Sequence, residues 1–255
     1  MGSAFYARRG DRFVPDESTR GPWDPDAQHA GPPAALLGRA IEQCDPRDDL
    51  QVGRVTLEIL APVPLAPLET RARVVRPGRS VELLEASLSG PDGEVMRATA
   101  WRLQPGAEEL RSGSDPAPPG PDLGMTREFF PTGQDVGYHT AMDYHFVAGA
   151  FLEPGPATVW MRMRMALVEG EEPSPLVRVL VAADSGNGVS AALDYKRYLF
   201  INTDLSVHLL RMPIGEWVCL DAVTHVDGLG LSDTALWDER GRIGRAAQTL
   251  LVRRR

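Results

Sequence analysis

The sequence has too few cysteines for either a disulfide framework or a structural zinc site. Cys44 and Cys219 are the only two cysteines in 255 residues, and neither belongs to a CxxC or Cys/His spacing. No apolar run approaches the roughly 18 residues that a membrane span requires. The first residues include Arg8, Arg9 and Arg12 where a signal segment would be apolar. These absences predict a reduced, cytoplasmic protein without a membrane span.

Positive charge is also scarce. The chain carries 27 basic and 35 acidic side chains, a net charge of −8, so no overall basic field would attract nucleic acid. The run 253–255 is the only basic cluster, and we interpret it as a solvated tail. The sequence has no GxSxG turn, no HExxH motif and no glycine-rich dinucleotide fingerprint after a strand. A serine hydrolase of the α/β type is therefore disfavoured, and we expect no metal and no cofactor.

A proline-rich stretch divides the chain into two nearly equal halves. Five prolines lie among Gly, Ser, Asp and Glu between residues 104 and 124. Such a segment has no apolar face to pack and is expected to cross the surface as a stiff linker. The sequence thus predicts one domain over 1–104, a linker over 105–124 and a second domain over 125–255.

Both halves show the same kinds of element, one helix and a series of alternating strands. The first half is predicted to form a helix over 31–44, which starts at two prolines, and strands over 51–60, 68–75, 80–89 and 94–103. The second half is predicted to form a helix over 175–183 and strands over 138–146, 158–166, 199–211, 217–225, 231–238 and 243–252. One helix for each antiparallel sheet, repeated twice, is an α+β architecture.

The halves also match residue by residue near their ends. Residues 93–100 (GEVMRATA) align without gaps on residues 241–248 (GRIGRAAQ), and strand, turn and strand agree in both. We interpret this as an internal duplication. It places Ala100 of the first copy opposite Gln248 of the second.

Six segments carry a resemblance to a known family across nearly the whole chain: HAGPPAALL (29–37), FLEPGPATVWMR (151–162), LVAADSGNG (180–188), YLFINTDLSVHLLR (198–211), GEWVCLDA (215–222) and GRAAQTLLV (244–252). Together they resemble the bacterial acyl-CoA thioesterase II family and its actinobacterial relatives. The resemblance implies a double hotdog, in which two tandem hotdog folds each wrap a curved antiparallel sheet around one helix. It also implies an acyl-CoA substrate and a homodimer. The two sheets should join edge to edge, which removes an exposed edge.

The same resemblance implies a site in the second half. In the family, water attacks the thioester in one step, positioned by an Asp, an Asn or Thr, and a Gln, which match Asp184, Asn202 and Gln248. The best-known members have Thr at the middle position, so neighbouring Thr203 stays an alternative there, as a residue that binds substrate. A carboxylate can take the proton of the water, and amides that both donate and accept can fix its orientation. His29, at the entry of the first helix, is a further candidate for substrate contact.

Each candidate also has a purely structural interpretation. Asp184 could simply end a helix before glycines, although a carboxylate at a helix C-terminus meets the unfavourable end of the dipole. Asn202 could occupy a bulge, Gln248 could lie on an exposed strand face, and His29 could be a local cap. Because the first copy has Ala100 at the Gln248 position, we expect that folding does not require this amide.

Two other functions compete with hydrolysis. A hotdog hydratase or dehydratase would need an Asp and a His closely spaced in sequence, and Asp184 has no His in its helix or in the next loop. A non-catalytic acyl-binding hotdog would keep the apolar tunnel without the chemistry. Hydrolysis of an acyl-CoA thioester is the preferred interpretation, and the sequence does not define the length of the acyl chain.

Overall fold

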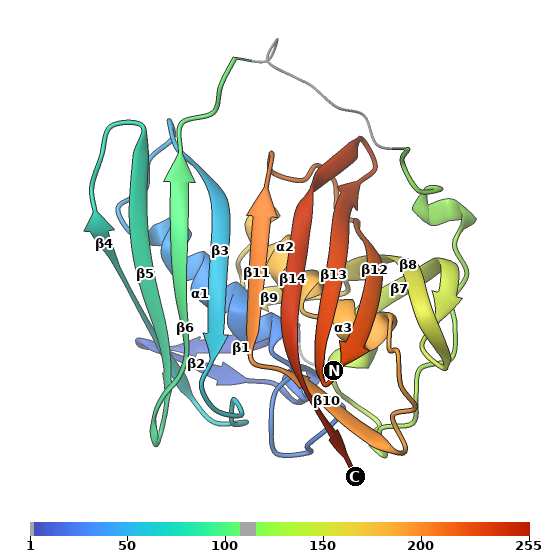
Figure 1. The fold of residues 1–255 in the computed structure, drawn as a ribbon. Helices are drawn as coiled ribbons and strands as arrows, with labels where there is room; N and C mark the ends of the chain where they lie inside the picture. Colours follow the sequence, from blue (N-terminus) through green and yellow to red (C-terminus); the bar gives the residue numbers. More distant parts are fainter. Residues whose placement is uncertain (1–2, 108–115) are drawn as a thin grey trace.

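One continuous 14-stranded sheet dominates the computed structural model, which describes residues 3–107 and 116–255 (Figure 1). The first half forms β1 (Ala4–Arg9), β2 (Arg12–Pro15), α1 (Gly31–Gln43), β3 (Gln51–Ile59), β4 (Leu68–Arg76), β5 (Val81–Gly90) and β6 (Gly93–Leu103). The second half forms β7 (Met142–Ala150), β8 (Glu153–Met163), β9 (Ala166–Val168), α2 (Pro175–Ala183), α3 (Gly186–Val189), β10 (Tyr198–Asn202), β11 (Asp204–Leu209), β12 (Val218–Asp227), β13 (Leu229–Asp238) and β14 (Gly241–Arg254). Three single turns of 3₁₀ helix cover Glu17–Thr19, Pro121–Leu123 and Tyr138–Thr140. The α+β class predicted from the sequence is confirmed.

The two halves have the same topology and meet at the centre of the sheet. From the centre outward the first half runs β3-β6-β5-β4-β2-β1, and the second runs β11-β14-β13-β12-β8-β7. Strands β3 and β11 pair antiparallel, with Thr56 opposite Ser206. The predicted edge-to-edge joining of the two sheets is therefore present, and it leaves neither central strand as a free edge.

The strand register supports the alignment of the two copies. Thr56 pairs with Thr99 on one side, and Ser206 pairs with Ala247 on the other. Because Thr56 and Ser206 are themselves opposite one another, Thr99 and Ala247 are equivalent positions. The next residues along the strands, Ala100 and Gln248, are therefore equivalent too, as the gap-free alignment predicts.

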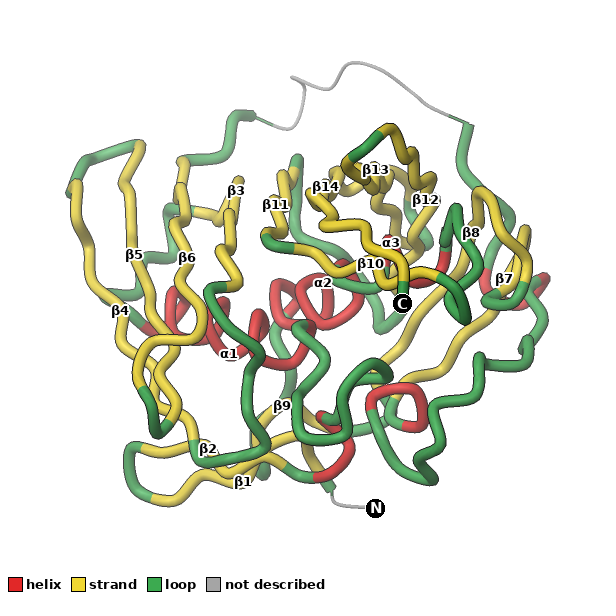
Figure 2. The backbone as a smooth tube through the Cα atoms, turned by 60° about the horizontal axis from the view of Figure 1, so that its bottom comes forward, coloured by secondary structure: helices red, strands yellow, loops and turns green. Residues whose placement is uncertain are grey.

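The two long helices lie together inside the curve of the sheet, between its central strands and its β1–β2 hairpin (Figure 2). They approach closely where α1 has glycines. A Cβ on Gly31 would lie 2.4 Å from the carbonyl oxygen of Val181, and one on Gly38 would lie 2.4 Å from a methyl of Leu180. This approach brings the start of α1 to the end of α2. No helix in the described ranges is long and apolar enough to cross a membrane.

The structure corrects the sequence prediction in two respects. The strand predicted over 199–211 is two strands, β10 and β11, which are separated at Thr203. Strand β10 pairs with β14 alone, whereas β11 pairs with both β14 and β3. The sequence prediction missed β1, β2 and the short helix α3. Part of the predicted linker, 108–115, lies outside the described residues. Its residues 105–107 and 116–120 are described and form no strand.

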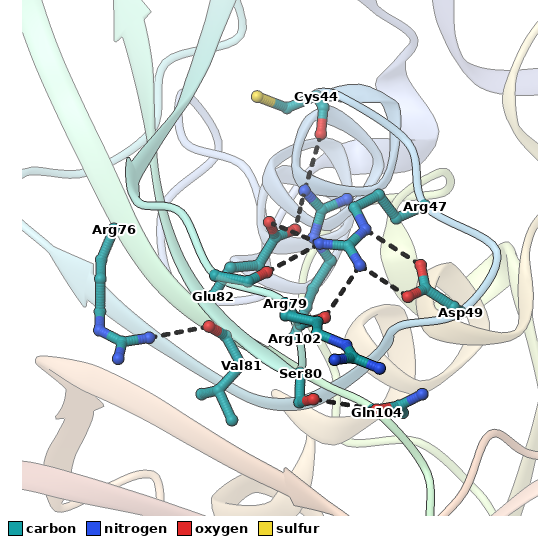
Figure 3. Close-up of polar contacts among 11 residues, drawn as sticks. Cys44, Arg47, Asp49, Arg76, Arg79, Ser80, Val81, Glu82, Arg102 and Gln104 are labelled. Atoms are coloured by element: carbon teal, nitrogen blue, oxygen red, sulfur yellow. Dashed lines mark hydrogen bonds and ion pairs between the residues drawn. The ribbon is translucent and has the colours of Figure 1, made fainter.

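The two halves differ at one equivalent pair of buried strand positions, which is charged in the first half and uncharged in the second. In the first half Glu82 of β5 forms a buried ion pair with Arg102 of β6, whose guanidinium also donates to the carbonyl oxygen of Cys44 at the end of α1 (Figure 3). In the second half the equivalent cross-strand pair is Gly230 and Leu250. The first copy thus uses buried polar groups to anchor its helix to the sheet. The second copy places its buried polar groups elsewhere.

Candidate active site

Asp184 lies at the end of α2 and is buried, with 5% of its surface exposed. The helix starts where the Ser174 hydroxyl accepts a hydrogen bond from the N–H of Val177 and Pro175 follows at the first helical position. Every residue from 179 to 183 is buried, so the helix is fixed by packing on all sides. It delivers the carboxylate of Asp184 to the point where α1 begins.

Two amides, one from β10 and one from β14, contact one oxygen of this carboxylate. Asn202 Nδ2 donates to Asp184 Oδ1 at 2.8 Å, and Gln248 Nε2 lies 3.3 Å from the same oxygen. The three residues predicted to form the site are therefore in contact. Thr203 is not part of this contact, because its side chain is exposed and its hydroxyl lies 3.4 Å from Asp204 Oδ1. The geometry favours Asn202 as the middle member.

The Gln248 amide is occupied on both ends. Its Nε2 also donates to the main-chain carbonyl of Asp184 at 3.1 Å, and its Oε1 accepts the N–H of Asn187 at 3.1 Å. With 1% of its surface exposed, Gln248 has no exposed-face role. The expectation that folding does not require this amide is corrected here, because it satisfies two buried backbone groups. Gln248 thus contacts both Asp184 and the start of α3.

His29 reaches the other carboxylate oxygen from the start of α1. Its Nδ1 lies 3.2 Å from Asp184 Oδ2 and also accepts the N–H of Gly31 at 3.1 Å. One nitrogen cannot accept from Gly31 and donate to Asp184 at once; the aligned hydrogen bond is the one from Gly31. We therefore assign the proton of the neutral ring to Nε2. His29 is both the local cap and a neighbour of Asp184.

Tyr138 holds the His29 ring in place. The two rings stack with centroids 3.8 Å apart and planes 9° apart, and the Tyr138 hydroxyl donates to the Val181 carbonyl oxygen at 2.7 Å. Burial lowers the pKa of His29, partly opposed by the charge of Asp184, and burial raises the pKa of Tyr138. Both groups are therefore neutral at neutral pH. The sequence carries no local sign of Tyr138, because it meets His29 only through tertiary packing.

The short helix α3 fits against β13 and β14 only because it starts at a glycine. A Cβ on Gly186 would lie 2.6 Å from Thr234 Oγ1 and 3.1 Å from Gln248 Oε1. Thr234 and Ser232 beside it are both buried, so neither can move into solvent. Close approach, and not backbone conformation, is the reason for glycine here.

We expect Gly186→Ala to lower the free energy of unfolding by about 1–3 kcal/mol, because the added methyl overpacks this contact. It should also displace the Gln248 amide from Asn187. Gly188→Ala is the matched control in the same helix, since a Cβ there has no atom within 4 Å. Chemical denaturation measures both. Equal stability of the two variants would show that α3 is not packed as described.

A small aromatic cavity of about 100 Å³ is lined in part by α3 and β10, two elements that contribute contacts to the site. Its wall includes Gly188 of α3, next to Asn187, and Phe200 of β10, which shares a strand face with Asn202. Trp23 and Phe130 complete part of the wall with rings stacked 5.2 Å apart. An apolar space beside a fixed carboxylate can bind an uncharged organic group.

Two helix-wrapped half-sheets joined into one sheet, with a polar site at the end of the second helix, define a protein of the double-hotdog class. A sequence profile of the acyl-CoA thioesterase N-terminal domain matches residues 19–103, and one of the acyl-CoA thioesterase C-terminal domain matches residues 114–252. The chain belongs to this acyl-CoA thioesterase family.

Solved structures show the same fold at low sequence identity. A candidate thioesterase II from Thermobifida fusca YX is 19% identical, with a TM-score of 0.76 over 99% of this chain and 96% of that one. A conserved hot dog fold protein of unknown function from Alicyclobacillus acidocaldarius is 16% identical, with a TM-score of 0.72 over 98% and 95%. The acyl-CoA thioesterase II TesB2 from Mycobacterium marinum is 14% identical, with a TM-score of 0.66 over 97% and 93%. No curated protein sequence matches closely enough to add to these comparisons.

Proposed function

We propose that the protein hydrolyses a fatty or other acyl-CoA thioester to the free acid and CoA, using water activated by Asp184. The observation that carries the proposal is the fixed carboxylate of Asp184. Asn202 and Gln248 orient Oδ1, and Oδ2 is left on the side of His29. A base held in one orientation beside an apolar cavity suits attack on an electrophilic carbonyl.

The reaction balances with this chain's own residues. Asp184 takes a proton from water as the water oxygen bonds to the thioester carbon, which gives a tetrahedral oxyanion. Collapse of that intermediate breaks the C–S bond, and the proton passes from Asp184 to the leaving sulfur. The neutral His29 ring, with its proton on Nε2, serves as a donor to the substrate, in the substrate-binding role expected from the sequence.

A panel of acyl-CoA esters, including aliphatic chains of increasing length and aromatic acyl groups, tests this proposal with free thiol as the readout. We expect turnover on at least one ester. The rate on the preferred ester should fall to background in Asp184→Asn. Binding of acyl-CoA without thiol release from any ester would instead support the non-catalytic acyl-binding protein.

One contact keeps a second candidate function open. Asp184 has no His near it in the sequence, as a hydratase or dehydratase would need, yet the fold brings His29 Nδ1 to 3.2 Å from Asp184 Oδ2. A His and an Asp together can move the proton and water of a hydration. Incubation with an enoyl-CoA separates the two activities, because a hydratase forms the hydroxyacyl-CoA and releases no thiol.

The cellular setting remains a prediction. A cytoplasmic location follows from the sequence expectations, and a homodimer follows from the family resemblance alone.

A further inference from the structure

Five basic residues lie on two neighbouring chain segments at the end of β14, where the structure differs from the tail that the sequence suggested. Arg253 and Arg254 continue strand β14 and pair with Leu199 and Tyr198 of β10. The N–H of Arg255 donates to the carbonyl oxygen of Arg197 at 3.0 Å. Lys196 precedes Arg197 and completes the group, which we call the basic edge. All five side chains are exposed.

The charges of the basic edge are uncompensated. Among the residues that the structure describes, none of its five side chains forms an ion pair, although the chain as a whole carries a net charge of −8. The nearby carboxylate of Asp194 accepts the main-chain N–H of Lys196 instead. Five free cations on an acidic protein create a local positive field, which attracts anions to this place in preference to the rest of the surface.

The basic edge is connected to the candidate active site by the aromatic cavity. Tyr195, in the cavity wall, directly precedes Lys196, and the guanidinium of Arg255 lies 5.9 Å from the ring centre of Trp23, also in the wall. Gly188, also in the wall, follows Asn187, whose N–H is bonded to Gln248. The wall of the cavity thus includes a residue next in sequence to the basic edge and a residue next in sequence to Asn187, which contacts Gln248.

The spacing along β14 fits a long, neutral linker between an anionic group and the reacting carbonyl. Gln248 and Arg254 are six residues apart on this strand, which is about 20 Å at roughly 3.4 Å per residue. The extended pantetheine arm of CoA is of similar length. It joins the thioester sulfur to a diphosphate and a ribose 3′-phosphate. Arginine is the side chain best suited to such phosphates, because its planar guanidinium binds them through two parallel hydrogen bonds.

We propose that the basic edge, Lys196, Arg197 and Arg253 to Arg255, binds the phosphates of the CoA portion of the substrate. The pantetheine arm then runs past the aromatic cavity to place the thioester at Asp184. This inference rests on the proposed function. It adds to it a separate binding site for the nucleotide end, which acts through substrate affinity and not through the chemical step.

A second group of exposed arginines provides a matched control. Arg71 and Arg73 of β4 and Arg97 of β6 line an open cavity of about 570 Å³ on the first half. Two of them are already engaged, Arg73 with Glu85 and Arg97 with Glu94. Their replacement changes the net charge as much as replacement of Arg253 to Arg255 does, and exposed ion pairs of this kind contribute little to stability.

The test compares the triple variant R253A/R254A/R255A with the control R71A/R73A/R97A on two substrates with the same acyl group. One is the acyl-CoA, and the other is the acyl-N-acetylcysteamine thioester, which has the reacting end without phosphates. In R253A/R254A/R255A we expect the KM for acyl-CoA to rise about ten-fold or more with kcat unchanged. The kcat/KM for the N-acetylcysteamine ester should not change, and the control should match the wild type on both.

Calorimetry with free CoA measures the same site without turnover. CoA should bind the wild type and the control with equal affinity. Its affinity for R253A/R254A/R255A should be lower by about ten-fold or more. Unchanged KM and CoA affinity in R253A/R254A/R255A would overturn the basic edge, and so would a larger loss in the control. Wild-type protein that releases thiol from neither ester would contradict the proposed hydrolysis instead, so the two failures are distinct.

Discussion

Asp184→Asn is expected to lower turnover by about 10²-fold or more while leaving the fold intact. The Asn side chain has the shape of Asp and keeps an oxygen to accept from Asn202 and Gln248. It cannot accept a proton from water, so the general base is lost and the binding contacts remain. Thiol release under saturating acyl-CoA measures kcat, and circular dichroism with thermal unfolding measures the fold.

The duplication supplies the control for this variant. Aligning Pro33 with Pro175 places Glu42 of α1 at the position that Asp184 takes after α2. In the structure Glu42 is partly buried and its Oε2 accepts the hydroxyl of Ser174 at 2.6 Å, so it supports the start of α2 and lies outside the site. Burial raises the pKa of Glu42, partly opposed by the Ser174 hydrogen bond.

We expect Glu42→Gln to change turnover by less than about three-fold, because Gln keeps an acceptor for Ser174. Because the pKa of Glu42 is raised in the folded state, ionisation of Glu42 lowers the free energy of unfolding as pH rises through that pKa. The neutral amide of Gln does not ionise, so the variant avoids this loss. The variant should therefore be as stable as the wild type at neutral pH. If Glu42→Gln and Asp184→Asn lost activity equally, the chemistry would not be confined to the second half.

Gln248→Ala is expected to lower turnover by about ten-fold or more, together with the free energy of unfolding by about 1–3 kcal/mol. The substitution leaves the N–H of Asn187 without its partner in a buried place and removes a donor from Asp184. Activity should fall because the carboxylate loses its fixed orientation. Chemical denaturation and thiol release, measured on the same preparation, separate the two effects.

Thr249→Ala is the matched control for Gln248→Ala. Thr249 is the next residue on β14, its side chain is exposed, and its bond to Asp204 is made by the backbone N–H. This variant should keep both turnover and stability within error of the wild type. Unchanged turnover in Gln248→Ala would remove Gln248 from the site, and unchanged stability would show that its buried bonds are replaced.

Local periodicity was sufficient for most of the secondary structure. The helix over 175–183 was predicted with its observed bounds, because prolines start both helices and apolar residues continue them. The gap-free match of 93–100 to 241–248 predicted the equivalence that the strand register shows. The β1–β2 hairpin was missed because it is short and pairs with β4 and β9 through contacts distant in sequence. The break at Thr203 was missed because β10 and β11 differ only in the strands that they pair with, and those strands are distant in sequence.

The sequence by itself determined the α+β class, the duplication and the residue types that can carry out hydrolysis, because these depend on periodicity and on side-chain chemistry. Tertiary structure alone decided which of those side chains meet. It brought His29 to Asp184 and Tyr138 to His29, placed Asn202 in contact with Asp184, and engaged the Gln248 amide on both ends. It also turned the run 253–255 from an expected tail into a strand end beside an aromatic cavity. The physical reason is packing: two helices in close contact and a shared sheet fix distances between residues that no local pattern relates.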